Sequence, residues 1–175
     1  GIRLNPNTDA KTLSQISTGK KENKFGVNQK IFLQLVDYLK DSKYLNLKCL
    51  SVHIGSQILN HKPYENMLKV IDKIISKSNH KFEYIDLGGG MGIDYEHNNS
   101  KLNLKKYSKN IQKFLKKNNS KIIFEPGRSI IGNSAVLVTK ILYIKEGYKK
   151  DFVILDAAMN DLMRPALYGA KHRII

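Results

Sequence analysis

Residues 122–128 are Ile-Ile-Phe-Glu-Pro-Gly-Arg, an apolar run that ends in an acid, a rigid turn and a cation able to form paired hydrogen bonds. Two earlier apolar runs end in a comparable way. The run 45–53 breaks into Ile54-Gly55-Ser56-Gln57, and the run 84–87 breaks into Gly88-Gly89-Gly90. Parallel βα units carry their active sites at the carboxyl ends of their strands. The three turns therefore predict a functional site at one end of a parallel sheet.

The hydrophobic periodicity around these turns alternates between strand and helix. Such βα repetition implies a parallel sheet. Residues 6–27 form a polar connection too long for a simple turn, so we expect this loop to carry function or to cover a site. The pattern predicts strands over 1–5, 45–53, 82–87 and 121–125, and helices over 28–41, 63–78 and 104–117.

The pattern changes after Gly132. Two apolar runs, 135–146 and 151–157, are separated only by residues 147–150, which predicts an antiparallel pair. We therefore expect residues 1–132 to form one domain and residues 133–175 to begin a second, β-rich one. Residues 159–169 are predicted to be a loop and a short helix interrupted by Pro165.

The basic composition does not favour nucleic-acid binding. The net charge is +15, but four of the 30 basic residues are Arg, which leaves 26 Lys, dispersed along the chain as on solvated surfaces. No run approaches the roughly 20 apolar residues of a membrane helix, so no membrane partner is expected. Cys49 is the single cysteine and cannot form an internal disulfide, which fits a reducing compartment.

The strand before His53 has two different faces, because side chains alternate along a strand. A polar inner face and a branched apolar outer face suit a barrel coated by helices. His53 itself, at a strand end, is compatible with a structural role or a site role. One face is predicted to carry Cys49, Ser51 and His53, and the other Leu50, Val52 and Ile54.

The glycines at 88–92 allow a backbone to approach an anion closely, and phosphate is the usual ligand. A tight turn without a ligand and the S-adenosylmethionine loop of a methyltransferase are the alternatives. The methyltransferase loop normally follows the first strand of its domain, whereas two βα units precede this one. It also leaves Glu125-Pro126-Gly127-Arg128 unexplained.

Four motifs in this order resemble those of the diaminopimelate decarboxylase family, and the likeness spans essentially the whole chain. The last of them separates that family from decarboxylases of ornithine and arginine. The motifs are His53 with residues 54–57, Leu87 to Gly92, Phe124 to Ile130, and Asp156 to Tyr168.

The resemblance implies an α/β fold, namely the second half of a pyridoxal-phosphate-binding (β/α)8 TIM barrel followed by the start of a C-terminal β domain. It implies decarboxylation of meso-diaminopimelate to L-lysine in the cytoplasm, by a homodimer with shared active sites. A catalytically silent homologue is the alternative.

The resemblance also implies roles for individual residues, with no metal site. Glu125 is expected at the pyridine nitrogen and His53 on the ring face, as the catalytic pair. Substrate carboxylates are expected at Arg128, Arg164 and Tyr168. The residues expected to bind the cofactor are His53, Ser56, Gly88, Gly89, Gly90, Glu125, Pro126, Gly127 and Arg128.

Two parts of the family's active site are expected outside this sequence. The cofactor-linking lysine belongs on an upstream strand, and a Cys-Glu segment belongs downstream; Cys49 is not that cysteine. We therefore expect the chain to be a fragment that is inactive alone. Its unpaired strand edges predict poor solubility.

Overall fold

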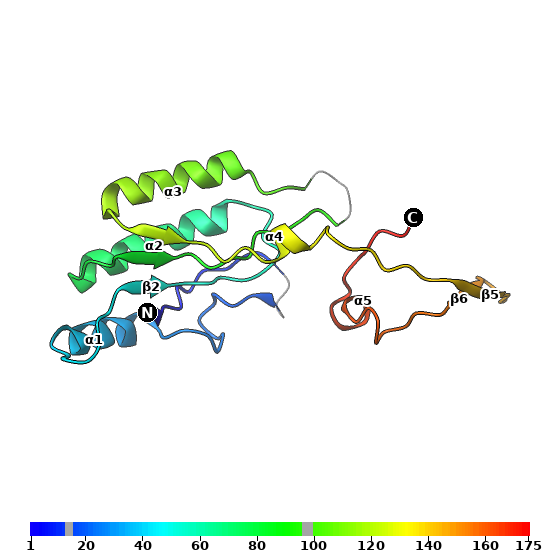
Figure 1. The fold of residues 1–175 in the computed structure, drawn as a ribbon, viewed down its shortest axis with the longest axis horizontal. Coiled ribbons are helices and arrows are strands. Elements are labelled where there is room, and N and C mark those ends of the chain that lie inside the picture. The colour runs from blue at the N-terminus through cyan, green and yellow to red at the C-terminus, as the bar shows by residue number, and fades with distance from the viewer. Residues whose placement is uncertain (13–15, 96–99) are drawn as a thin grey trace.

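The computed structural model describes residues 1–12, 16–95 and 100–175 (Figure 1). Part of the predicted loop 6–27, residues 13–15, lies outside the described residues. The elements in chain order are β1 (Ile2–Arg3), α1 (Gln29–Lys40), β2 (Cys49–Ser51), α2 (Lys62–Ser78), β3 (Tyr84–Asp86), α3 (Leu104–Asn118), β4 (Lys121–Ile123), α4 (Arg128–Ile131), β5 (Ile141–Lys145), β6 (Phe152–Leu155) and α5 (Arg164–Tyr168).

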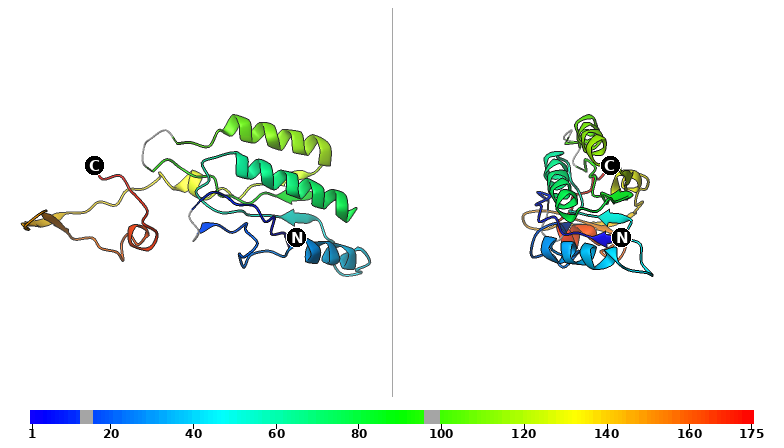
Figure 2. Two further views of the ribbon diagram at one scale, coloured as in Figure 1. Left: turned by 180° about the vertical axis from the view of Figure 1, so that it is seen from behind. Right: turned by 90° about the vertical axis from the view of Figure 1, so that its left-hand side faces the viewer.

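The first four strands form one parallel sheet in the order β1-β2-β3-β4. Leu50 pairs with Ile2 on one side and with Ile85 on the other, and Ile85 pairs in turn with Ile122. Helices α1, α2 and α3 lie side by side as an outer layer on the sheet (Figure 2). The predicted parallel βα arrangement is confirmed, and we call these strands and helices the parallel layer.

The core of the parallel layer lies between the sheet and its helices. Leu50, Val52 and Ile54 are at most 1% exposed, whereas Ser51 and His53 remain partly exposed on the opposite face. The predicted alternation along this strand is therefore confirmed. Each helix adds an apolar stripe to the core, as amphipathic helices do. The buried helical side chains include Phe32, Val36, Met67, Ile71, Tyr107, Ile111 and Phe114.

Asparagine side chains set the ends of these helices. The Oδ1 atoms of Asn28 and Asn103 accept hydrogen bonds from the backbone amides of Ile31 and Lys106, both at 3.0 Å, which caps α1 and α3. Asn79 and Asn119 take left-handed conformations after α2 and α3. Asn tolerates this conformation better than most residues, so each of these helices stops where the chain must turn back to the sheet.

The predicted strands are longer than the observed ones. The run 45–53 forms a ladder only over Cys49–Ser51, where it pairs with both β1 and β3. Residues 45–48 connect α1 to the sheet, and Leu45 is 63% exposed. The apolar run therefore overestimated the length of the strand. Its residue Leu47 is buried, but it lies in the connection before β2 and not in the strand.

Residues 133–175, which we call the arm, extend away from the parallel layer (Figure 1). Strands β5 and β6 are antiparallel, as predicted. However, the expected strand 135–146 begins only at Ile141, because the described residues offer no strand to pair with 135–140. Pro165 does not interrupt the short helix α5 but lies in its first turn, where the missing amide hydrogen costs nothing.

Candidate active site

The three polar turns predicted at the strand ends lie together. The amide of Gly89 donates to His53 Nδ1 at 3.1 Å, which links the ends of β3 and β2. The amide of Glu125 donates to the carbonyl oxygen of Gly88 at 2.9 Å, which links the ends of β4 and β3. The turn after β2 and the turn after β4 are thus both hydrogen-bonded to the glycine turn after β3.

His53 is held as a neutral imidazole. Because Nδ1 accepts the Gly89 amide, the ring proton lies on Nε2. Burial lowers the pKa of His53, and the charge of Arg3 lowers it further, while Asp86 acts in the opposite direction. The carbonyl oxygen of His53 accepts from Thr18 Oγ1 at 2.8 Å and from Arg3 Nη2 at 3.3 Å. Both the ring and the backbone of His53 are therefore fixed by neighbouring segments.

Asp86 organises the end of β3. One carboxylate oxygen accepts from Ser51 Oγ at 3.0 Å, and the other accepts from the amide of Gly88 at 2.8 Å. Ser51 and Asp86 also stand opposite each other in the strand register. This carboxylate fixes the direction in which the chain enters the glycine turn.

The turn at 88–90 requires glycine, because its backbone takes left-handed conformations and lies close to neighbouring backbone. Gly88 and Gly90 have φ values of +64° and +92°, which disfavour any other residue. A side chain on Gly89 would collide with the carbonyl oxygen of Glu125. The hydroxyl of the buried Tyr64 donates to the carbonyl oxygen of Gly89 at 3.1 Å, which fixes this peptide from α2.

The triplet amides differ in what they bind. Those of Gly88 and Gly89 already donate to Asp86 and His53. In the described part of the chain, the amide of Gly90 donates to no protein acceptor, although its carbonyl oxygen accepts from Ile58 at 2.9 Å. Gly90 is thus the member of the triplet whose amide is available to a ligand.

Gln57 connects the turn after β2 to Arg128. Its Oε1 atom accepts from Arg128 Nη1 at 3.1 Å and from the Ile93 amide at 3.3 Å, and its Nε2 atom donates to the Ile93 carbonyl oxygen at 2.6 Å. The expected cofactor residues Ser56, Pro126 and Gly127 flank these groups in sequence. The Ser56 amide donates to the Ile16 carbonyl oxygen at 3.0 Å.

Arg128 and Arg164 meet at Tyr95. Their guanidinium carbons lie 5.9 and 5.1 Å from the centroid of the Tyr95 ring. Burial lowers the pKa of Arg128, and the nearby Arg164 adds to this effect. Tyr168, at the end of α5, is 40% exposed, and its hydroxyl forms no hydrogen bond with another described residue. The structure therefore brings together the two predicted arginines but not the predicted tyrosine.

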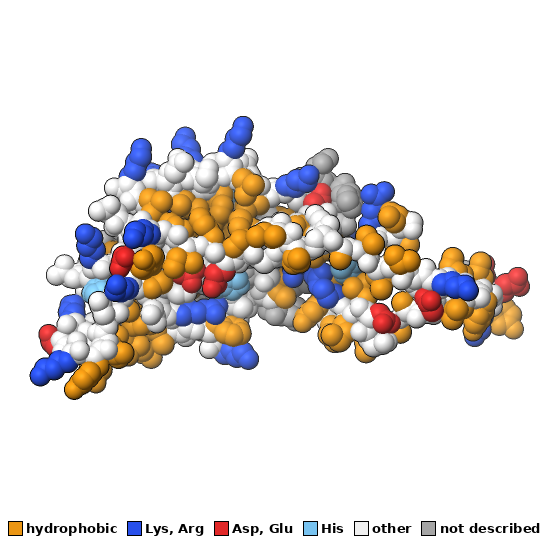
Figure 3. All heavy atoms as spheres, in the orientation of Figure 1, with side chains coloured by type: hydrophobic (Ala, Val, Ile, Leu, Met, Phe, Trp, Pro, Cys, Tyr) orange, Lys and Arg blue, Asp and Glu red, His pale blue; other side chains and the backbone are white. Residues whose placement is uncertain are grey.

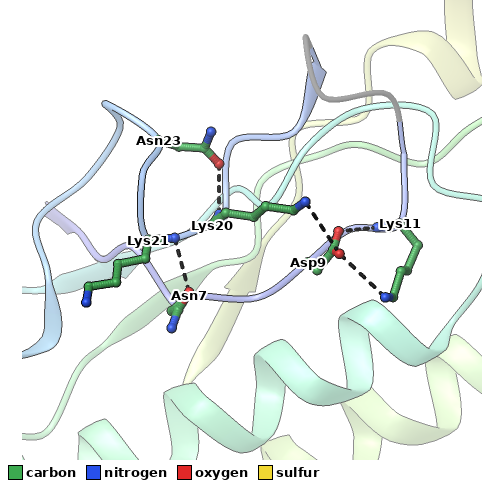
Figure 4. A network of polar contacts seen from close by, with 6 residues as sticks. All are labelled: Asn7, Asp9, Lys11, Lys20, Lys21 and Asn23. Atoms are coloured by element: carbon green, nitrogen blue, oxygen red, sulfur yellow. Dashed lines mark hydrogen bonds and ion pairs between the residues drawn. The ribbon is translucent and has the colours of Figure 1, made fainter.

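The long loop 6–27 packs over the end of β2, as one of the two expectations for it stated. Ser17 bridges to Gly55, and the Thr18 amide donates to the Ile54 carbonyl oxygen at 3.1 Å. Its outer part is stabilised by its own polar contacts, in which Asp9 lies 3.5 Å from both Lys11 Nζ and Lys20 Nζ (Figure 4). The backbone amide of Lys11 is the main cause of the lowered pKa of Asp9.

Sequence reasoning missed several residues of this site. Asp86 directly precedes a recognised motif and Gln57 lies within one, but the hydrogen bonds to Ser51 and Arg128 that give them roles join distant parts of the chain. Tyr64 belongs to an apolar helical stripe and looks like ordinary core. Tyr95 and His172 lie in polar stretches of sequence and belong to no recognised motif. The missed residues are Arg3, Gln57, Tyr64, Asp86, Tyr95 and His172.

A family profile described as the pyridoxal-binding domain of pyridoxal-dependent decarboxylases matches residues 1–132. The chain belongs to this family, and the parallel layer is part of its (β/α)8 barrel. Pyridoxal phosphate is accordingly its cofactor. The comparisons do not support the methyltransferase alternative, because the family profile is that of decarboxylases and so are the relatives described next.

Diaminopimelate decarboxylases are among the most similar relatives. The Helicobacter pylori enzyme is 44% identical over 99% of this chain, and the enzyme of Neisseria meningitidis serogroup B is 42% identical over 99%. The crystal structure of the H. pylori enzyme complexed with L-lysine superposes with a TM-score of 0.91 at 42% identity over 98% of the chain. The chain spans 43% of the length of that structure and of the H. pylori sequence, and 42% of the Neisseria enzyme.

Two further findings concern membrane helices and metal sites. Within the described residues, no helix is both long and apolar enough to cross a membrane. The same residues contain no group of three or more His, Cys, Asp and Glu side chains arranged to hold a metal ion.

Proposed function

We propose that this chain is part of an enzyme that decarboxylates meso-2,6-diaminopimelate to L-lysine and CO2. The single observation that carries the proposal is the junction of the three strand-end turns, where the Gly89 amide meets His53 and the Glu125 amide meets Gly88. These turns contain the motifs of the family. The similarity to diaminopimelate decarboxylases along the whole chain supports this substrate.

The residues present fit the phosphate of the cofactor. The Gly88–Gly90 turn packs so closely against neighbouring backbone that it must lack side chains, since a Cβ atom on Gly90 would collide with the carbonyl oxygen of Gly55. The amide of Gly90 is the one in the triplet that remains available, and a backbone N–H is a good donor to a phosphate oxygen. We assign the phosphate to the Gly90 amide, the Ser56 hydroxyl and the backbone amides of Gly127 and Arg128. Pro126 has no amide hydrogen to donate and is assigned to the cofactor site as part of the rigid turn, while Gly88 and Gly89 shape the glycine turn.

Glu125 and His53 are assigned to the cofactor ring. When bound, pyridoxal phosphate supplies the electron sink that accepts the electron pair released as CO2 departs. Glu125 is assigned to the ring nitrogen, where a carboxylate holds a proton on that atom. His53 is assigned to the ring face; its neutral form, held by the Gly89 amide, adds no positive charge there.

Arg128 and Arg164 are assigned to substrate carboxylates, with Tyr168 as a further hydrogen-bond donor. Guanidinium groups suit this role because their planar fork matches a carboxylate. Their meeting at Tyr95, from two distant segments, supports a shared task. Tyr168 shares the helix α5 with Arg164, which supports its assignment to the same ligand.

The proposal includes the architecture of the whole protein. Residues 1–132 form the second half of the barrel, and residues 133–175 begin a C-terminal β domain. The active protein is a cytoplasmic homodimer, with the cofactor-linking lysine and the Cys-Glu segment in the rest of the sequence. The length of the relatives, more than twice that of this chain, supports this arrangement.

The assignment of Glu125 is tested in the full-length protein with Glu125→Gln. We expect turnover of meso-diaminopimelate to fall at least tenfold while bound cofactor, measured by its visible absorbance, stays near the wild-type level. Glu146→Gln, which makes the same change in the arm, is the matched control and should keep full turnover. Unchanged turnover in Glu125→Gln would remove Glu125 from the mechanism, and a wild-type protein without turnover would favour the silent homologue.

A further inference from the structure

Tyr95 lies between two groups of equal charge. The guanidinium carbons of Arg128 and Arg164 are 5.9 and 5.1 Å from its ring centroid. These arginines follow β4 and begin α5, so distant parts of the chain converge on this ring. The face of an aromatic ring attracts cations. One side chain thus contributes to holding both arginines.

The remaining contacts of the two guanidinium groups are neutral. Arg128 Nη1 donates to Gln57 Oε1 at 3.1 Å, and Arg164 Nη1 lies 3.4 Å from His172 Nε2. Among the described residues, neither arginine forms an ion pair with a carboxylate. The ring of His172 packs edge-on against Tyr95, with centroids 5.3 Å apart. Within the part of the chain that the structure describes, no carboxylate is therefore paired with either guanidinium group.

Two cations held close together repel each other, so this arrangement favours an anionic ligand. A guanidinium that meets a ring through its face keeps its in-plane N–H groups for an acceptor. We propose that Tyr95 is a positioning residue that holds Arg128 and Arg164 for the substrate carboxylates and thereby sets the affinity for substrate. This inference rests on the proposed function, which assigns those carboxylates to the two arginines.

The test uses the full-length enzyme with its cofactor and compares Tyr95→Leu with Tyr95→Phe. Leucine removes the ring, so we expect KM for meso-diaminopimelate and Kd for L-lysine, measured by calorimetry, to rise about tenfold, which corresponds to about 1.4 kcal/mol. We expect kcat to change less than threefold and the cofactor absorbance to stay the same. Phenylalanine keeps the ring face, so both constants should remain within about twofold of wild type.

A graded series covers the case in which Tyr95→Leu does not fold. Phenylalanines carrying one to five ring fluorines at position 95 preserve the shape but progressively weaken the attraction for cations. The inference predicts that Kd for L-lysine rises with each step. A flat series, or Tyr95→Phe as weak as Tyr95→Leu, overturns it. If wild type is active but the ring has no effect, only this inference fails; if wild type neither turns over substrate nor binds L-lysine, the proposed function fails as well.

Discussion

The parallel layer and the arm differ in how far their apolar side chains are buried. Leu50 and Ile85 in the layer are 0% exposed, whereas Leu142 and Ile144 in the arm are 54% and 60% exposed. All buried core side chains of the described residues lie between Leu4 and Phe114. Figure 3 shows apolar side chains on the surface along the arm and over β4, beside α3. The layer thus has a core of its own, while the arm relies on pairing within the chain.

Local hydrogen bonds define the arm where packing does not. Asp156 accepts from Thr139 Oγ1 at 2.7 Å and from the Lys140 amide at 2.8 Å, which joins the entry of β5 to the exit of β6. A two-stranded sheet is marginally stable by itself. The comparison shows that buried packing orders the parallel layer. In the arm, strand pairing and local hydrogen bonds provide the order, while the described apolar side chains of β5 and β6 stay largely exposed.

The largest difference should come from truncating a leucine in each region. Leu50→Ala removes a fully buried side chain from β2 and should lower the free energy of unfolding by about 4 kcal/mol. Leu142→Ala, on the exposed β5, should cost less than about 0.5 kcal/mol in the full-length protein if β5 is as exposed there as it is here. Urea unfolding measures both. A comparable loss for Leu142→Ala in the full-length protein would show that further sequence buries β5.

The next largest effect should come from adding a methyl group to a glycine in each region. In Gly89→Ala the new Cβ atom collides with the Glu125 carbonyl oxygen, so we expect a loss of about 3 kcal/mol. In Gly169→Ala the space is open, and only the left-handed φ of +58° opposes the change, at about 1 kcal/mol. Thermal unfolding of the full-length variants provides the comparison, and equal shifts of Tm would contradict it.

The smallest expected effect on the free energy of unfolding is that of lowering the pH. Burial lowers the pKa of both His53 and His172, so the unfolded chain binds more protons than the folded chain below about pH 6.5. The free energy of unfolding should therefore fall as the pH falls through the lowered folded pKa. His53→Gln should remove more of this dependence than His172→Gln, because His172 is less deeply buried. Stability measured from pH 8 to 5 tests the order, and a reversed order would refute it.

The sequence predicted the features that depend on local pattern. The alternation through Leu50 and Ser51, the three main helices and the turns at the strand ends are consequences of periodicity and of Gly and Pro placement. Strand length was overestimated, because a strand ends where its partners end. Pro165 was taken as a break, although it begins α5.

The candidate site was predictable only where motifs carried it. His53, the glycine triplet and Glu125 stood in recognisable stretches. The partners that fix them, such as Tyr64 at the Gly89 carbonyl oxygen, come from long-range contacts that periodicity does not encode. Tyr95 gains its role only when α5 returns to the layer.

The strand order β1-β2-β3-β4 has a consequence for synthesis on the ribosome. Each strand pairs with the one translated just before it, so every new βα unit can dock as it emerges, without waiting for later sequence. Pairing between successive strands needs shorter loop closures than pairing between the first and last strands would, which favours assembly in chain order. Until β4 has been made, the growing sheet therefore has an open edge that the next strand to leave the ribosome pairs with.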